Sequence, residues 1–265
     1  MISGPGSVTG GGGKDGGLDS LTEALGIVRS ASEAGIPLRL VGGLAVRVLC
    51  PDFPPREREA QDLDFASVST AVRPLVAFLT DLGYLPDRTF NALYGRKQLF
   101  FAHDKTGRAL DVMVDRLEMC HTIEFKDRIE RMPYTLDVLD ILLSKLQIIE
   151  LNDKDVQDVV YLLSAYPINE SGDSGAIDVQ AFRRLVGSDW GWWRTVTMNL
   201  DRIESLVNGE YSHFVPEAPQ LDPVEQLKTL GRVAYEAPKS LRWKARSRVG
   251  DKVRWYQIPE ETQHY

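Results

Sequence analysis

Leu38-Arg-Leu-Val-Gly-Gly-Leu-Ala-Val-Arg47 is followed, after a proline-rich loop, by Gln61-Asp-Leu-Asp-Phe-Ala66. The first stretch is typical of a short apolar strand that meets a glycine pair at the start of a helix. The second stretch is typical of another short strand. Because alternate residues of a strand point to the same side, Asp62 and Asp64 are predicted to present two carboxylates on one face of a sheet.

These two stretches together suit phosphate chemistry. Mg²⁺ prefers one or two carboxylates together with substrate phosphates. Gly42 and Gly43 let a phosphate approach the backbone at a helix N-terminus, where amide groups and the helix dipole favour negative charge. The simpler explanations are solvated aspartates on an edge strand and a tight turn that needs positive φ. The combination of glycines and carboxylates favours transfer of a nucleotidyl group.

Working outward, the pattern predicts a small α/β sheet. Helical spacing of apolar residues begins at Leu18, and a second helix is expected from Ser69 as N-cap to Gly83. Strands are predicted at 36–41, 62–66, 98–102 and 109–114, with a hairpin link between the last two. A short helix is expected over 44–49.

Beyond Thr135 the sequence predicts helices and no strand. Residues 137–151 are apolar nearly all round, which is typical of a buried helix. Asn152 is predicted to cap a helix that ends at Ala165, and 178–250 are expected to form three more helices. We therefore predict an α+β fold: a disordered glycine-rich tail (1–17), an α/β domain with a small mixed sheet and flanking helices (18–133), and an all-helical C-terminal domain (134–265).

Composition excludes several classes of protein. The chain has 265 residues, a net charge of −7 and 43% apolar residues, and it has no apolar run of membrane-spanning length. Cys50 and Cys120 are too few for a disulfide framework, and the four histidines are too scattered for a zinc site. A glycine-rich start in place of a signal peptide favours a cytoplasmic protein.

Three segments resemble the nucleotidyltransferase superfamily of DNA polymerase beta-like enzymes: Gly42-Gly43, Asp62-Leu-Asp64 and Leu110-Asp-Val-Met-Val114. Two more, Lys145-Leu-Gln147 and Lys154-Asp-Val-Gln-Asp158, resemble the abortive-infection nucleotidyltransferase toxins and their uncharacterised bacterial relatives. The resemblance covers roughly residues 36–165. It implies transfer of NMP from an NTP such as ATP, with release of pyrophosphate. The second position of the glycine pair often carries serine in this superfamily, and here backbone amides must replace that hydroxyl.

The chemistry of such a transfer assigns roles to the acidic residues. In-line displacement needs carboxylates from neighbouring strands to hold two Mg²⁺ ions, for which Mn²⁺ is an alternative. Asp62 and Asp64 are predicted to hold both ions. Asp111, on an adjacent strand, completes the metal set and helps to deprotonate or orient the acceptor hydroxyl. Asp115, four residues further on the same predicted face, leaves this assignment open.

Several cations and one further acid are candidates for nucleotide binding. Lys145 lies in an apolar helix and needs an anionic partner, either a triphosphate or the aspartate cluster, unless it extends to the helix edge. Asp158 is predicted to face solvent or the cleft, whereas Asp155 is assigned to helix capping. Arg56 and Arg58 precede the carboxylates and are candidates for the triphosphate, with a solvated charged loop as the alternative. The hairpin cations Arg96 and Lys97 have the same two explanations.

The acceptor is not fixed by the sequence. RNA is slightly favoured, because the run from Lys239 to Arg254 is basic and carries Trp243 and Trp255 for base stacking. Packing of this run on the acidic body is the alternative. The resemblance also implies tRNA ends, proteins or antibiotic-type small molecules as acceptors, and an antitoxin partner if the protein is a toxin. A catalytically silent nucleotide-binding regulator and a structural module are the rival classes.

Overall fold

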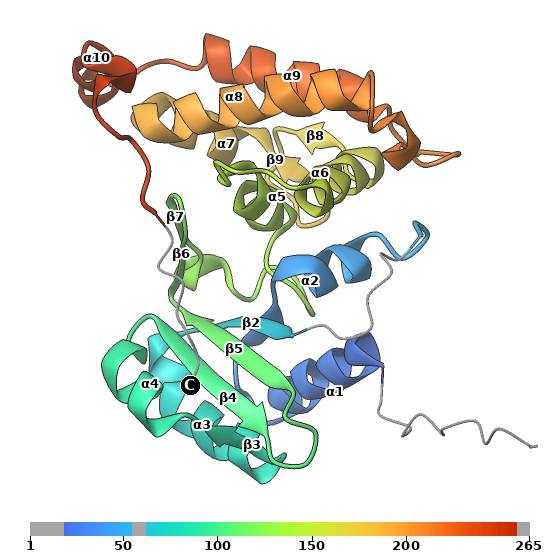
Figure 1. The fold of residues 1–265 in the computed structure, drawn as a ribbon, viewed down its shortest axis with the longest axis vertical. Coiled ribbons are helices and arrows are strands. Elements are labelled where there is room, and N and C mark those ends of the chain that lie inside the picture. Colours follow the sequence, from blue (N-terminus) through green and yellow to red (C-terminus); the bar gives the residue numbers. More distant parts are fainter. Residues whose placement is uncertain (1–18, 55–61, 259–265) are drawn as a thin grey trace, which may run out of the picture.

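A computed structural model describes residues 19–54 and 62–258. Its main sheet has the strand order β1-β2-β5-β4-β3 (Figure 1). Strands β2 and β5 run parallel, and the other neighbours run antiparallel. The strands are β1 (Leu38–Leu40), β2 (Leu63–Ser67), β3 (Tyr84–Pro86), β4 (Gln98–His103) and β5 (Ala109–Val114).

The two faces of this sheet differ in chemistry. On one face Leu63 lies across from Leu110, and Phe65 lies across from Val112, all fully buried. Helix α1 (Ser20–Glu33) packs on this side, where Glu23 accepts a hydrogen bond from the Tyr84 hydroxyl. The opposite face carries the aspartates of β2 and β5. Helices α3 (Val72–Asp81) and α4 (Arg88–Tyr94) contact β3 and β4, respectively.

The remainder of the chain is mostly helical. A group of helices packs above the sheet, and α10 (Leu241–Ser247) follows it (Figure 1). The group consists of α5 (Val138–Leu146), α6 (Asp153–Ala165), α7 (Val179–Ser188), α8 (Trp190–Val207) and α9 (Pro223–Glu236). Short strands β8 (Ile168–Asn169) and β9 (Ile177–Asp178) pair within it. Short 3₁₀ helices occur at Ser69–Ala71, Lys126–Arg128, Ser212–Phe214 and Gly250–Lys252.

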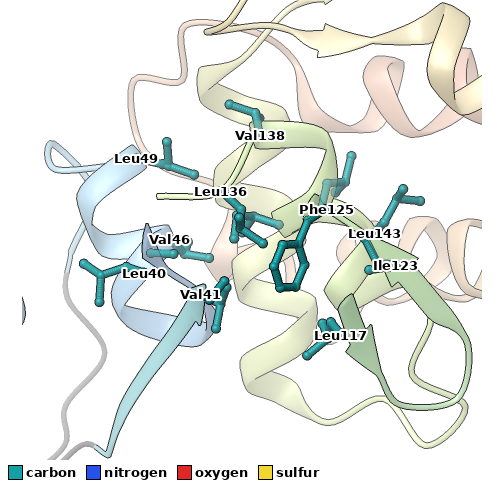
Figure 2. Close-up of a cluster of buried hydrophobic side chains, with 14 of the residues drawn as sticks. Leu40, Val41, Val46, Leu49, Leu117, Ile123, Phe125, Leu136, Val138 and Leu143 are labelled. Atoms are coloured by element: carbon teal, nitrogen blue, oxygen red, sulfur yellow. The ribbon is translucent and has the colours of Figure 1, made fainter. Parts of the chain in front are cut away.

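Helix α2 (Gly42–Leu49) and a small hairpin join the two halves. The hairpin consists of β6 (Arg116–Glu118) and β7 (Thr122–Glu124). Figure 2 shows apolar side chains of α2, the hairpin region and α5 converging on the buried Phe125 ring. The outer edge of β1 is also covered, because Leu40 exchanges backbone hydrogen bonds with Tyr134 and Leu136. The junction is therefore a continuous core.

The structure confirms the predicted α+β fold, with its small mixed sheet and helical C-terminal part. Several details of the prediction were wrong. Ser69 does not cap α3, which begins at Val72 after a 3₁₀ turn. The helix expected to end at Leu151 stops at Leu146, and four helices fill 178–250. Strands β8 and β9 lie where no strand was expected.

Further sequence predictions concern membrane spans, the cysteines, the N-terminal tail and the domain boundary. Within the described ranges, none of the helices combines the length and apolar character that a bilayer crossing demands. Both cysteines are buried free thiols. The predicted disorder of 1–17 concerns residues outside the described ranges, and the domain boundary at 133 stays a prediction.

We predict that Phe125→Ala lowers the free energy of unfolding by about 3–5 kcal/mol, because the ring fills the core that joins the two halves. Leu241→Ala is the matched control, since the Leu241 side chain is 85% exposed, and it should change stability by less than about 0.5 kcal/mol. Urea unfolding measures both. Equal effects of the two changes would show that the junction core does not carry stability.

Candidate active site

The central feature of the site is a pair of carboxylates in register. Asp64 on β2 lies directly across from Asp111 on the parallel strand β5, so both side chains leave the same face of the sheet. Asp64 is half-buried and Asp111 is buried. The Gln98 side-chain amide donates a 2.6 Å hydrogen bond to Asp111 Oδ1 from the neighbouring strand β4. This bond fixes the orientation of the Asp111 carboxylate.

Asp62 differs from this pair. It precedes β2 and is exposed to solvent. Within 19–54 and 62–258, no three histidine, cysteine or acidic side chains are grouped so that they could hold a metal ion. The in-register pair by itself fits Mg²⁺, which commonly takes one or two protein carboxylates and completes its shell with water and substrate phosphates. The assignment of Asp62, Asp64 and Asp111 as metal ligands stays a prediction.

Gly42 is held against the carboxylate of Asp64. Its φ is +65°, and a Cβ atom at this position would lie 2.7 Å from Asp64 Oδ2. The Val41 amide donates a 3.0 Å hydrogen bond to the Asp64 carbonyl, which ties the start of α2 to β2. The turn therefore needs glycine for two reasons, its backbone angle and the close approach of the carboxylate.

A cavity of about 480 Å³ opens beside this turn. The walls come from the start of α2, from β2 and β5, from the β6–β7 hairpin, and from α5 and α6. Its lining residues are Val41, Gly42, Gly43, Asp64, Met113, Leu117, Met119, Ser144, Lys145, Ile148, Asn152, Lys154 and Asp155. We call this cavity the glycine cleft. Four residues that the sequence predicted as parts of a site line this cleft together: Gly42, Gly43, Asp64 and Lys145.

Lys145 has two anionic partners of its own. Its ammonium lies 3.1 Å from Asp155 Oδ1 and 3.0 Å from Asp158 Oδ2, and its side chain is only 12% exposed. Burial alone would lower the pKa of Lys145, but the carboxylates of Asp158 and Asp155 outweigh burial and raise that pKa. The ammonium is therefore charged, and it joins α5 to α6.

The positions of Asp158 and Asp155 correct the sequence prediction. Asp158 faces neither solvent nor the glycine cleft; it is buried and paired with Lys145. Asp155 does not cap α6 with its side chain. The cap is Asn152, as predicted, and its Oδ1 accepts hydrogen bonds from the amides of Lys154 and Asp155. Asp158 thus supports Lys145 and does not line the cleft.

Asp115 does not share the face of Asp111. Strand β5 ends at Val114, and Asp115 has a φ of +64°. Its carboxylate accepts a 2.8 Å hydrogen bond from the Ser69 amide. Burial would raise the pKa of Asp115, but this bond and the nearby Lys126 lower it. Asp115 therefore stabilises a turn, and the alternative that it replaces Asp111 was wrong.

The basic C-terminal run packs on helix α8. Arg194 donates two hydrogen bonds of 3.1 and 3.0 Å to Asp251, and the Trp255 indole donates to Thr195. The Arg246 guanidinium lies 4.6 Å from the centroid of Trp190. The Trp243 ring meets Trp193 edge-on at 5.2 Å. These contacts favour the packing alternative over base stacking. Arg56 and Arg58 lie outside the described residues.

Gln98 is the site residue that sequence reasoning missed. A usable signal was present, because Gln98 and Asp111 lie on the two strands of a predicted hairpin. The aspartates at 155 and 158 gave a second signal. Residues three apart on a helix share a side, so the pair could have been matched with the buried Lys145.

Comparison with known proteins gives a distant likeness. No protein-family model matches the chain, and no curated protein matches it in sequence. One similar solved structure is the antibiotic-resistance factor ANT(2'')-Ia, with 14% identity, a TM-score of 0.37, and coverage of 55% of this chain and 82% of that chain. Another is an antigenic nucleotidyltransferase-like protein from Paracoccidioides brasiliensis, with 12% identity, a TM-score of 0.40, and coverage of 83% and 94%. We therefore base the function on the geometry of this chain.

We predict that Lys145→Met destabilises the protein by about 3–5 kcal/mol at pH 7, because it leaves Asp155 and Asp158 buried without their cation. A buried carboxylate without a cation favours its protonated form, so the folded variant binds more protons than the unfolded chain. The stability loss should shrink as the pH falls toward 5. Urea unfolding at both pH values is the measurement.

The double variant Lys145→Met with Asp158→Asn is the control for this prediction. It should regain part of the lost stability at pH 7 and show a weaker pH dependence. In the unmodified protein the pH dependence runs the other way, because the pKa of Lys145 is raised by folding. The ion pair stabilises the fold fully below the ordinary lysine pKa of 10.5, and this stabilisation is lost as the pH rises through the folded-state pKa. A pH-independent loss in Lys145→Met would contradict the ion-pair account.

We predict that Gly42→Ala destabilises the protein by about 2 kcal/mol or more, because positive φ strains an L-residue and the new Cβ meets Asp64. Gly26→Ala is the control, since a Cβ there meets nothing within 4 Å in α1, and it should be neutral or slightly stabilising. Adding Asp64→Ala to Gly42→Ala should recover the steric part of the loss. Thermal unfolding tests all three, and an additive double variant would exclude the clash.

Proposed function

We propose that this protein is a nucleotidyltransferase that moves NMP from an NTP to an acceptor hydroxyl and releases pyrophosphate. The observation that carries the proposal is the in-register pair of Asp64 and Asp111 beside a helix N-terminus that only glycine can open. A cavity of about 480 Å³ lies at that helix start, within the range of about 300–1,000 Å³ that is usual for ligand sites.

The glycine cleft supplies the groups that a triphosphate needs. The first amides of an α-helix lack intrahelical partners, and Gly42 and Gly43 at the start of α2 line the cleft, where the helix dipole favours an anion. An ammonium has three donors, and two of those of Lys145 are directed to Asp155 and Asp158. The third would donate to a phosphate in the cleft, which Lys145 lines. Lys154 adds a second cation to the wall.

The carboxylates would act on the reacting groups. Asp64 and Asp111, with the exposed Asp62 just before β2, would hold two Mg²⁺ ions, or Mn²⁺ in their place. When bound, these ions neutralise charge that develops on the phosphates. Asp111 would orient the acceptor hydroxyl and accept its proton, and Gln98 holds Asp111 in position. The acceptor oxygen bonds to the α-phosphorus while the bond to the leaving pyrophosphate breaks.

The proposal includes a role as a toxin and has a regulator without turnover as its rival. A toxin role with a cognate antitoxin rests on the resemblance of residues 145–158, and growth arrest on expression would test it. A nucleotide-binding regulator without turnover would use the same cleft. Pyrophosphate release with each NTP and total RNA distinguishes the enzyme from the regulator.

We predict that Asp64→Asn and Asp111→Asn each lower pyrophosphate release by at least about a hundredfold, because the loss of one group that stabilises transition-state charge costs about that much. The control is Asp81→Asn, an exposed aspartate at the end of α3, which should keep full activity. A thermal shift with Mg²⁺ and NTP gives a readout besides activity.

The same variants test the carboxylate pair without turnover. In EDTA, Asp64→Asn should unfold at a higher temperature than the unmodified protein, because like charges in register repel. Mg²⁺ should stabilise the unmodified protein more than the variant. If Asp64→Asn retained full pyrophosphate release, the proposed function would be wrong.

A further inference from the structure

A second hollow, of about 610 Å³, adjoins the glycine cleft. The two cavities share Met113 and Met119 as lining residues. Gln98 lines the second hollow and donates its hydrogen bond to Asp111, whereas Asp64 lines the glycine cleft. The two cavities therefore adjoin at Met113 and Met119, with Asp64 on one side and Gln98, the hydrogen-bond partner of Asp111, on the other. In-line displacement needs the attacking and leaving groups on opposite sides of the phosphorus, so a nucleotide in the cleft leaves this hollow to the acceptor.

The hollow is positively charged in a protein of net charge −7. Its lining carries three cations, Arg96, Lys97 and Arg116, against one carboxylate, Glu118, which leaves a formal charge of +2. Glu118 is shared, since Lys97 Nζ and Arg116 Nε each lie 2.6 Å from one of its oxygens, and Arg116 also lies 3.8 Å from Glu124 outside the lining. Arg96 is exposed and forms no ion pair with residues of the described ranges. An anionic ligand would complete this charge balance.

The hollow also carries an unusual amount of exposed apolar surface. Leu93, Tyr94 and Ile258 line it, and they are 72%, 40% and 62% exposed. The Tyr94 ring is supported by Phe90, with 4.9 Å between centroids. Ile258 arrives on the C-terminal segment, which runs down from α10 beside β7 (Figure 1) and is fixed where the Gln257 amide donates to the Cys120 carbonyl. A supported, exposed aromatic ring is a platform for a planar group.

We propose that this hollow is the acceptor pocket and that the acceptor is the terminal nucleotide of a single-stranded RNA. A phosphate would lie at Arg96, a base would stack on Tyr94, and the terminal hydroxyl would point to Asp111. Cations that bind phosphate together with an aromatic ring are the usual means of single-strand recognition. The same charge disfavours a polycationic aminosugar, which would face like charge. This inference rests on the proposed transfer and specifies its acceptor.

Binding of a fluorescently labelled, mixed-sequence single-stranded RNA tests the proposal without turnover. Fluorescence anisotropy over a range of salt concentrations should show that Arg96→Glu weakens binding about tenfold at 0.1 M salt and lowers the salt slope by about 0.7. Tyr94→Ala should weaken binding with the salt slope unchanged, because stacking involves no counterion. Arg242→Glu is the matched control: Arg242 is an exposed cation of α10, distant in the chain from the hollow, and its reversal should leave affinity within twofold.

Each outcome has a defined meaning. Loss of binding in Arg242→Glu but not in Arg96→Glu would place RNA on the C-terminal run and overturn the pocket. Binding of a polycationic aminosugar in preference to RNA, with a thermal shift that Arg96→Glu enhances, would also overturn it. A thermal shift with Mg²⁺ and NTP is read in parallel. If that shift is absent while RNA still binds through Arg96, the proposed function fails and the nucleic-acid pocket stands.

Discussion

The carboxylate of Asp64 occupies the space that a side chain at residue 42 would need. This constraint forces glycine with a positive φ at the turn from β1 into α2. The turn aims the α2 N-terminus at the carboxylate face of the sheet, and α2 then packs against both α5 and α6. One close approach therefore sets the anion-binding amides beside the acidic pair and also fixes where the helical half sits.

The opposite wall of the cleft depends on a buried ion pair. A lysine among apolar residues is costly unless a partner compensates its charge. Here Asp155 and Asp158 supply that partner from the next helix, so α5 and α6 cannot slide without breaking two short contacts. The first role of the ion pair is therefore to hold the two helices together. Its functional value is that it holds a charged ammonium at the wall of the glycine cleft, at a fixed distance from the sheet.

The strand-alternation rule predicted a shared face for Asp62 and Asp64, but Asp62 lies just before β2, and the rule could not relate Asp64 to Asp111. Register between strands depends on tertiary pairing, which no local pattern contains. Asp158 was misplaced for a related reason. The apolar stripe of α6 was taken as its only buried side, yet α6 also contacts α2, α5 and α9, so its other side is buried too. Asp115 was misplaced because strand β5 ends one residue earlier. Strands β3, β6 and β7 were missed because each has three residues and, unlike β1, none lies within a longer apolar run of the sequence.

The number of basic residues along the chain favoured the C-terminal run as the RNA-binding segment. Their placement in the structure favours the second hollow instead. In the C-terminal run Lys239 and Arg246 lie over tryptophan rings, and the acid of the run, Asp251, is paired with Arg194 of α8. A cation that is already paired gains little from a phosphate, since the new contact must replace an existing one. Around the second hollow, Lys97 and Arg116 share Glu118, Arg116 also lies near Glu124, and Arg96 has no ion pair within the described ranges. An anionic acceptor would bind where positive charge is locally uncompensated. The total number of cations along a segment does not decide this.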